Sequence, residues 1–288
     1  MIQKPVTWTK PPTTVTNQIQ ILKSRGMAFC DEEKAKSFLR RVNYYRFCIY
    51  ANSLTNTKDN FSGLSFEQVE SFYILDRKLR SVLMSALSWA EVSFRTSFAY
   101  HVSLATNDPF FYLDSANFRN PYFHTQSLGE IEKDFKNDST LAVFGQDTLG
   151  NDIYVAPPAW KMVEITTFGR ISKLFCNLKK IAWIDKVARQ FGFDKTEIKS
   201  VIKSIADLRN KCAHHRKILF SNFNSVPALT ADMSALGINN NSIGGFIFVL
   251  YKMMKTEPNV QKSFIDDIKN IYQQCPPTIK ANFEAVVF

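Results

Sequence analysis

One stretch of about forty residues, from 65 to 103, constrains the fold of this chain more than any other segment. Apolar side chains recur there at steps of three and four residues: Phe72, Leu75, Leu79, Leu83, Leu87, Ala90, Phe94 and Phe98. This is the period of an α-helix with one apolar stripe. Neither proline nor glycine interrupts the run. The pattern therefore predicts one long helix in the core of the protein.

Charged side chains follow a neighbouring stripe of the same predicted helix. Glu91 and Arg95 are one turn apart, and so are Asp76 and Arg80. The spacing alone favours two surface ion pairs, each contributing on the order of a few tenths of a kcal/mol. The alternative is that Arg80, Glu91 and Arg95 form a polar layer that holds a catalytic arginine in place.

The rest of the chain also reads as helical, and ten glycines in 288 residues disfavour a glycine-rich β architecture. Periodicity and capping residues predict further helices at 16–25, 31–42, 122–137, 159–177, 181–191, 194–217, 242–255 and 258–274. Extended or irregular structure is expected at 1–14, 52–63, 108–121, 138–158 (with a short strand at 152–155) and 221–241. The predicted fold class is all-α, with a small helical N-terminal unit at 1–60 and a larger helical domain at 61–288 that ends in C-terminal helices.

The composition narrows the functional classes. A net charge of +10 fits a polyanionic partner, either nucleic acid or an anionic membrane surface, although charge alone does not decide between them or require either. The five cysteines are scattered without zinc spacing, which is typical of free thiols in a reducing compartment. The start of the chain lacks the apolar segment of a signal peptide, and the longest dense apolar run, 244–251, is too short to span a bilayer. We therefore expect a cytoplasmic protein without a membrane partner.

The segment from Leu208 to Arg216 collects side chains suited to phosphodiester chemistry. Arg209 can neutralise a phosphate, and His214 or His215 can transfer a proton near neutral pH. On a helix Asn210 and His214 share a face, but the Cα atoms of Arg209 and His214 diverge by roughly 140°. One helix thus offers an incomplete site, which two copies packed about a two-fold axis would complete. The alternative is that these cations only complement the dipole of a helix C-terminus.

Motifs along nearly the whole chain match one family in order and spacing. They are Lys4-Pro5 with Gln18, Leu22 and Gly26; Asp31 to Ala35 with Leu39; Tyr44-Tyr45-Arg46 with Tyr50; Leu75 to Arg80; Glu91 with Phe94-Arg95-Thr96; Pro158-Ala159-Trp160 with Glu164; Phe168-Gly169 with Ser172-Lys173-Leu174; and Leu208 to His215. The chain resembles the Abi family of bacterial abortive-infection proteins, the AbiD/AbiF type, which belongs to the HEPN superfamily.

The resemblance implies a HEPN-type helical bundle that cleaves RNA without a metal or other cofactor, as a toxin-like effector in phage defence. Arg209, Asn210 and His214 match the superfamily's arginine, polar and histidine positions. The implied roles are charge stabilisation for Arg209, orientation for Asn210 and proton transfer for His214. His215 is a candidate helper. In place of an expected Arg-Leu-Trp-Asn-like segment the chain has Arg216 to Asn222 without a tryptophan, so this segment departs from the family's pattern.

Further side chains are candidates for binding the RNA substrate: Tyr45, Arg46, Tyr50, Lys211 and Arg216. For Tyr45, Arg46 and Tyr50 the alternative is packing within the N-terminal unit. The main alternative function is a non-catalytic HEPN module that binds RNA or protein and is held by a non-coding RNA or an antitoxin. The Arg209 and His214 pair favours the nuclease. A DNA-binding regulator is less well supported, because no helix-turn-helix or zinc motif is evident.

Overall fold

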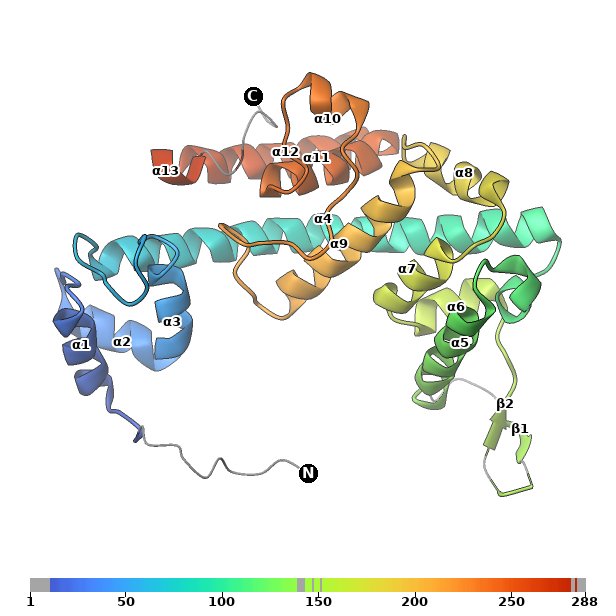
Figure 1. The fold of residues 1–288 in the computed structure, drawn as a ribbon, viewed down its shortest axis with the longest axis horizontal. Coiled ribbons are helices and arrows are strands. Elements are labelled where there is room, and N and C mark those ends of the chain that lie inside the picture. The colour runs from blue at the N-terminus through green and yellow to red at the C-terminus, as the bar shows by residue number, and fades with distance from the viewer. Residues whose placement is uncertain (1–10, 139–142, 147, 151, 281–282, 284–288) are drawn as a thin grey trace. The chain divides into compact units, whose positions relative to one another are not determined.

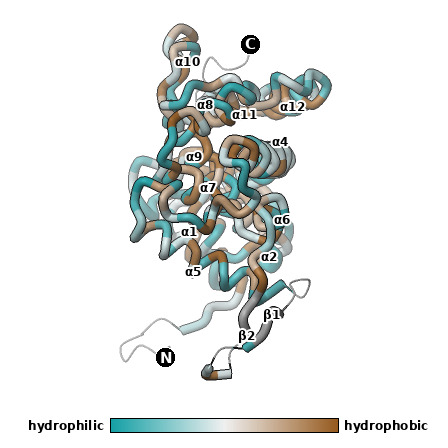
Figure 2. Tube along the Cα trace, turned by 90° about the vertical axis from the view of Figure 1, so that its right-hand side faces the viewer, coloured by the Kyte–Doolittle hydropathy of each residue, from teal (hydrophilic) through white to brown (hydrophobic). Residues whose placement is uncertain are grey.

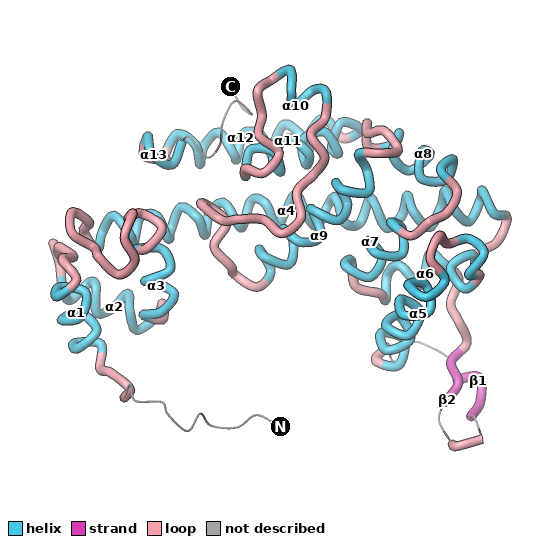
Figure 3. The backbone as a smooth tube through the Cα atoms, viewed as in Figure 1, coloured by secondary structure: helices cyan, strands magenta, loops and turns pink. Residues whose placement is uncertain are grey.

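The computed structural model describes residues 11–138, 143–146, 148–150, 152–280 and 283 (Figure 1). The arm expected at 1–14 therefore lies, up to residue 10, outside the described residues. Helices dominate the described chain, and Figure 3 shows strand only in one small hairpin. Its strands, β1 (Val143–Gln146) and β2 (Asp152–Tyr154), pair antiparallel. The predicted helical fold class is confirmed, and β2 coincides with the short strand expected there.

The chain divides into two compact units, Met1–Arg77 and Lys78–Phe288. The helices are α1 (Val15–Ser24), α2 (Glu32–Arg41), α3 (Tyr44–Ala51), α4 (Phe66–Thr106), α5 (Pro121–Lys136), α6 (Ala159–Ile165), α7 (Phe168–Cys176), α8 (Ile181–Gln190), α9 (Glu197–Ala213), α10 (Ala231–Ala235), α11 (Ile243–Met253), α12 (Pro258–Gln273) and α13 (Pro277–Lys280). Short 3-10 turns, η1 (Phe111–Leu113), η2 (Ser115–Asn117) and η3 (Met254–Thr256), complete the described elements.

The N-terminal unit contains α1 to α3 and the start of α4. Its helices begin at side-chain caps, as the oxygens of Thr14 and Asp31 accept backbone N–H groups of α1 and α2. Gly26 follows α1 with a φ of +89°, and a Cβ there would lie 2.4 Å from Ser62 Oγ, so the turn requires glycine. The stretch 52–63, expected to be extended or irregular, is a loop that packs on the unit, because the ring of Phe61 is fully buried.

In the larger unit, α4 supplies the buried stripe around which other helices pack. The apolar positions predicted from its period are fully buried: Leu79, Leu83, Leu87, Ala90, Phe94 and Phe98. Helix α9 lies beside α4 and packs on α7 (Figure 1). Figure 2 shows brown and teal alternating along α12, whose buried residues Phe264, Ile268 and Ile271 recur at helical spacing. The expected C-terminal helices are thus present.

Two helix predictions are corrected, and two short helices were not expected. The helix expected at 159–177 is two helices, because the backbone is extended at Thr166 and Thr167. The guanidinium of Arg95 donates to the carbonyl of Val163, which a continuing helix would use for the N–H of Thr167. The irregular stretch 221–241 contains the short helix α10, and α13 was not expected. The helix expected at 194–217 begins at Glu197 and ends at Ala213.

Candidate functional site

Helix α9 begins at a reciprocal cap. The Oδ1 of Asp194 accepts the backbone N–H of Glu197 at 2.8 Å, and the Oε2 of Glu197 accepts the N–H of Asp194 at 3.1 Å. These reciprocal bonds form a capping box. Hydrogen bonds from the Thr196 hydroxyl and then from the Glu197 backbone lower the pKa of Asp194. The cap fixes the start of α9, and with it the register of the residues at its other end.

The two histidines end α9 and do not lie within it, which corrects the expectation of a helix continuing past them. His214 is the C-cap, and His215 follows with a φ of +54°. The N–H of His215 donates to Cys212 O at 3.0 Å, and that of Arg216 donates to Lys211 O at 2.9 Å. These two bonds form a Schellman motif, which usually has glycine at the left-handed position. His214 and His215 are both exposed.

Behind the helix end, a buried carboxylate joins two arginines. Glu91 of α4 accepts from Arg209 Nε on its Oε2 at 3.0 Å, and from Arg95 Nε on its Oε1 at 3.1 Å. Arg95 also donates to the carbonyls of Val163 and Thr166, the latter at 2.6 Å. Glu91 and Arg95 are each 8% exposed. A buried charge needs such partners, and here each has at least two.

The interpretation of Glu91, Arg95 and Arg80 as members of surface ion pairs is therefore wrong, because all three are buried. Arg80 is 5% exposed, and its guanidinium donates to the carbonyl of Arg216 at 3.4 Å. Helix α4 thus contacts α9 through Glu91 and the segment after α9 through Arg80. The sequence could not reveal that the carbonyls of Val163 and Thr166 accept from Arg95, because every residue has a backbone carbonyl whatever its type.

The side chains of Arg209 and Asn210 contact each other, and the backbone N–H of His214 donates to Asn210 O at 3.0 Å. The Oδ1 of Asn210 accepts from the Arg209 guanidinium at 3.4 Å. Of the five N–H donors of an arginine, Arg209 uses two within the described residues, for Glu91 and Asn210, so three remain there for an anion. The Arg209 side chain is 33% exposed, which leaves it within reach of solvent. Among the described residues, no hydrogen bond joins the imidazole of His214 to Arg209 or Asn210.

The residues that the sequence suggested for RNA binding differ in their burial and in their contacts. Tyr50 is 1% exposed and donates its hydroxyl to Asp76 Oδ2 at 2.7 Å, so it packs the N-terminal unit and is not free to stack on a base. Tyr45 is 75% exposed. It belongs with the half-buried Arg46 to the N-terminal unit. The Nζ of Lys211 donates to Asn222 O at 2.9 Å and lies 4.9 Å from the centre of the Phe223 ring. The side chain of Arg216 is exposed.

The segment that lacks the expected tryptophan packs by other means. Ile218 and Leu219 are buried there, and Phe220 is 38% exposed with a φ of +54°.

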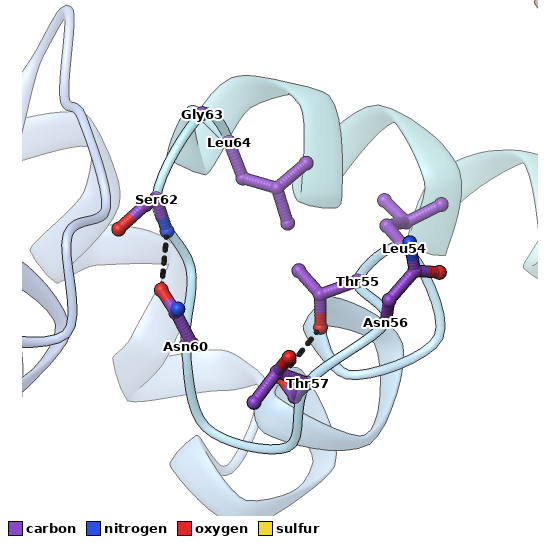
Figure 4. Close-up of a pocket in the computed structure, with 8 residues that line it drawn as sticks. All are labelled: Leu54, Thr55, Asn56, Thr57, Asn60, Ser62, Gly63 and Leu64. Carbon is purple, nitrogen blue, oxygen red and sulfur yellow. Dashed lines mark hydrogen bonds between the residues drawn. The ribbon is translucent and has the colours of Figure 1, made fainter.

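A hollow in the N-terminal unit is lined by residues 54–57, 60 and 62–64 (Figure 4). Its lining contains hydroxyl, amide and leucine side chains without a titratable group, so it offers no acid or base.

Comparison with known families decides the identity. The family model for Abi-like proteins matches residues 37–220, from α2 to the end of the segment after the histidines. The chain belongs to this Abi-like family. The family's association is with abortive infection, a form of phage defence, and the matched range contains Glu91, Arg95, Arg209 and His214. No curated protein and no solved structure matches the chain. Over the described ranges, no helix combines the length and the apolar character needed to cross a bilayer.

Proposed function

We propose that this Abi-like protein is a HEPN-type endoribonuclease that cuts RNA without a metal and acts as a toxin-like effector in phage defence. The observation that supports this most is the anchoring of Arg209. Its Nε is bound to buried Glu91, while three of its N–H donors have no partner in the described part of the chain, next to Asn210 and near the end of α9. Arg209 is thus held in position by Glu91 while its other N–H groups can donate to a phosphate, whose negative charge grows in the transition state.

The proposed reaction uses the nucleophile that RNA carries. The 2′-oxygen attacks the adjacent phosphorus, the bond from phosphorus to the 5′-oxygen breaks, and a 2′,3′-cyclic phosphate and a 5′-hydroxyl result. His214 in its neutral form accepts the proton of the 2′-hydroxyl, or in its protonated form donates one to the leaving 5′-oxygen. Arg209 stabilises the negative charge on the non-bridging oxygens. Asn210 orients Arg209, because its amide oxygen accepts from that guanidinium.

A homodimer completes this site. The apolar face of α9 (Ile198, Val201, Ile202, Ile205 and Leu208) is fully buried within one chain, so a second copy cannot use it. The C-terminal end of the helix remains, where Asn210, His214 and Arg216 are exposed. Two such ends related by a two-fold axis bring two arginines and two histidines into one cleft. One histidine then serves as base and the other as acid.

The test is cleavage of RNA by the purified protein in the presence of EDTA, with the products analysed for 2′,3′-cyclic phosphate ends. Arg209→Ala is expected to lower the rate by about 10²–10³-fold, and His214→Ala by about 10²–10⁴-fold. His215→Ala is the matched control, because it removes a neighbouring exposed imidazole. Loss of activity in EDTA, or activity that survives His214→Ala and fails in His215→Ala, would contradict the proposal.

An RNA-binding assay distinguishes the proposed nuclease from a non-catalytic RNA-binding module. His214→Ala removes one imidazole and few cations, so RNA binding in a gel-shift assay should persist when cleavage is lost. A wild-type protein that binds RNA and never cuts it would instead be a non-catalytic RNA-binding module.

Expression of the wild type is expected to slow bacterial growth, and Arg209→Ala or His214→Ala is expected to relieve this effect. A toxin of this kind needs restraint, so we also propose a regulatory non-coding RNA or antitoxin as a partner.

A further inference from the structure

Four cations gather on the larger unit away from Arg209: Arg119, Lys179, Lys199 and Lys203. We call them the basic strip. Lys199 and Lys203 lie one turn apart on α9. Arg119 and Lys179 come from the two segments that meet at the isolated antiparallel bridge between Phe118 and Leu178. Three separate parts of the chain therefore contribute to the strip.

The bridge explains why Arg119 and Lys179 point outward. Successive side chains of extended backbone lie on opposite faces. Phe118 and Leu178 are 2% and 0% exposed, so they face the core. Arg119 and Lys179 are each the next residue along, and both are exposed. The backbone bonds from Arg119 N to Asn177 O at 2.8 Å and from Lys179 N to Asn117 O at 2.9 Å hold the two segments together.

Packing holds Lys199 close to Arg119 although both are cations. The Nζ of Lys199 donates to Cys176 O at 2.7 Å. Burial, and then the charge of Arg119, lower the pKa of Lys199. Lys199 and Lys203 both lie near enough to the Cys176 thiol to affect its pKa electrostatically. Like charges held together cost folding free energy, and an external anion would offset that cost.

Carboxylates do not neutralise the strip. Within the described part of the chain, none of its four cations forms a salt bridge, whereas Arg170 and Arg189 do. Of the nearest acids along α9, two are engaged at its start, and the third, Asp207, forms no salt bridge with the strip within the described residues. Asp194 and Glu197 form the helix cap. Asp207 is half-buried, and its Oδ2 is enclosed by protein. The strip therefore presents a net positive surface.

The strip is aligned with the proposed catalytic end of α9. At about 100° per residue, the Cα atoms of Asn210 and His214 each lie about 20° from that of Lys203 around the helix axis. At about 1.5 Å per residue, Lys203 and His214 are about 16 Å apart along it. A chain of phosphates bound at the strip would thus reach His214 by following one face of one helix.

We propose that the basic strip binds the phosphates of single-stranded RNA and directs the strand to Asn210 and His214. The inference rests on the proposed ribonuclease function. A single strand fits because it can turn its 2′-oxygen, phosphorus and 5′-oxygen into line for the reaction, which the fixed backbone of a duplex resists. The strip provides affinity, and the end of α9 provides the chemistry.

The test compares two double variants that each remove two positive charges. Arg119→Ala with Lys203→Ala alters the strip, and Lys186→Ala with Lys262→Ala alters exposed cations of α8 and α12. The probe is a fluorescein-labelled 20-nucleotide 2′-O-methyl oligouridylate, which cannot be cut, and the Kd is measured by fluorescence anisotropy. Two lost phosphate contacts should raise the Kd roughly 14-fold at 0.15 M salt and roughly 65-fold at 0.05 M, and lower the salt slope by about 1.4. The control pair should change it little.

Cleavage then distinguishes the two proposals. The strip variant should lose kcat/KM on a 20-nucleotide RNA by about tenfold through KM. It should retain the wild-type value on the dinucleotide UpA, which reaches only the end of α9. Equal Kd values for the strip and control variants, with both folded by circular dichroism, would overturn the strip while cleavage by the wild type still supported the nuclease. Strip-dependent binding without any cleavage would reject the nuclease and keep the strip. Tighter strip-dependent binding of duplex RNA than of the single strand would refute the choice of ligand.

Discussion

Replacing Glu91 by glutamine removes the one negative charge that Arg95 and Arg209 share. The carboxylate now accepts from both, at 3.1 and 3.0 Å. A glutamine of the same shape has one oxygen acceptor, and its NH₂ group would face an N–H of the other arginine. Among the described residues, Arg95 keeps two backbone carbonyls, whereas Arg209 keeps one acceptor, Asn210. We therefore expect the guanidinium of Arg209 to shift from its present position in the Glu91→Gln variant.

The expected magnitude follows from burial. Breaking a buried ion pair by removing one partner costs about 3–5 kcal/mol. The two carbonyls that remain on Arg95 and the 33% exposure of Arg209 put Glu91→Gln at the lower end, near about 3 kcal/mol. For a unit of this size that lowers the melting temperature by about 6–12 °C. A displaced transition-state donor should lower the cleavage rate by about 10²-fold.

Thermal unfolding by circular dichroism and RNA cleavage below the melting temperature test this together. Arg209→Ala is the matched variant, because it leaves the pair of Glu91 and Arg95 intact. It should reduce the rate as much as Glu91→Gln while costing only about 1 kcal/mol of stability. A Glu91→Gln protein that melts within about 2 °C of the wild type would refute the estimate from burial. A folded one that cuts RNA at the wild-type rate would show that Glu91 does not position Arg209.

Three further outcomes are expected. Asp194→Ala should lower the free energy of unfolding by about 1 kcal/mol at pH 7. Because the folded-state pKa of Asp194 is lowered, its contribution is present above the unfolded value of about 3.9, and the difference in urea unfolding should vanish as the pH falls through the folded value. His215→Gly should stabilise the protein by about 1 kcal/mol in the same assay and keep cleavage, because glycine accepts the φ of +54° without strain; loss of cleavage would assign catalysis to His215. Light scattering should give about twice 33 kDa, and an active monomer would exclude the shared cleft.

The sequence predicted most helices because their apolar period and their caps are local. The buried stripe of α4 and the reciprocal bonds of Asp194 and Glu197 are examples. The break between α6 and α7 was not predictable in this way. It depends on the guanidinium of Arg95, which lies 68 residues before Val163. Only the folded chain brings the two together, so no local pattern marks the break.

The end of α9 shows the same limit for the candidate site. Lysine, arginine and histidine continue past Ala213 without the glycine that usually marks a left-handed residue, so the pattern predicted more helix. The actual end has consequences for chemistry. A geometry that assumes a continuing helix would turn His215 about 100° from His214. With His215 in the left-handed region, the two imidazoles do not follow that helical separation, so separate substitution of each is the test of which one transfers the proton.

The buried charges of Glu91 and Arg95 on α4 bear directly on the proposed role of Arg209. The spacing of Glu91 and Arg95 is the same in a surface pair and in a buried one, and the arrival of Arg209 from 118 residues away distinguishes them. Glu91, Arg95 and Arg209 together carry a net charge of +1, and only Arg209 among them is substantially exposed. A phosphate at this site would therefore meet one fixed positive charge on a rigid support. Most of the affinity for a long anion must then come from cations elsewhere, which is why affinity at the basic strip and rate at Arg209 should respond to different substitutions.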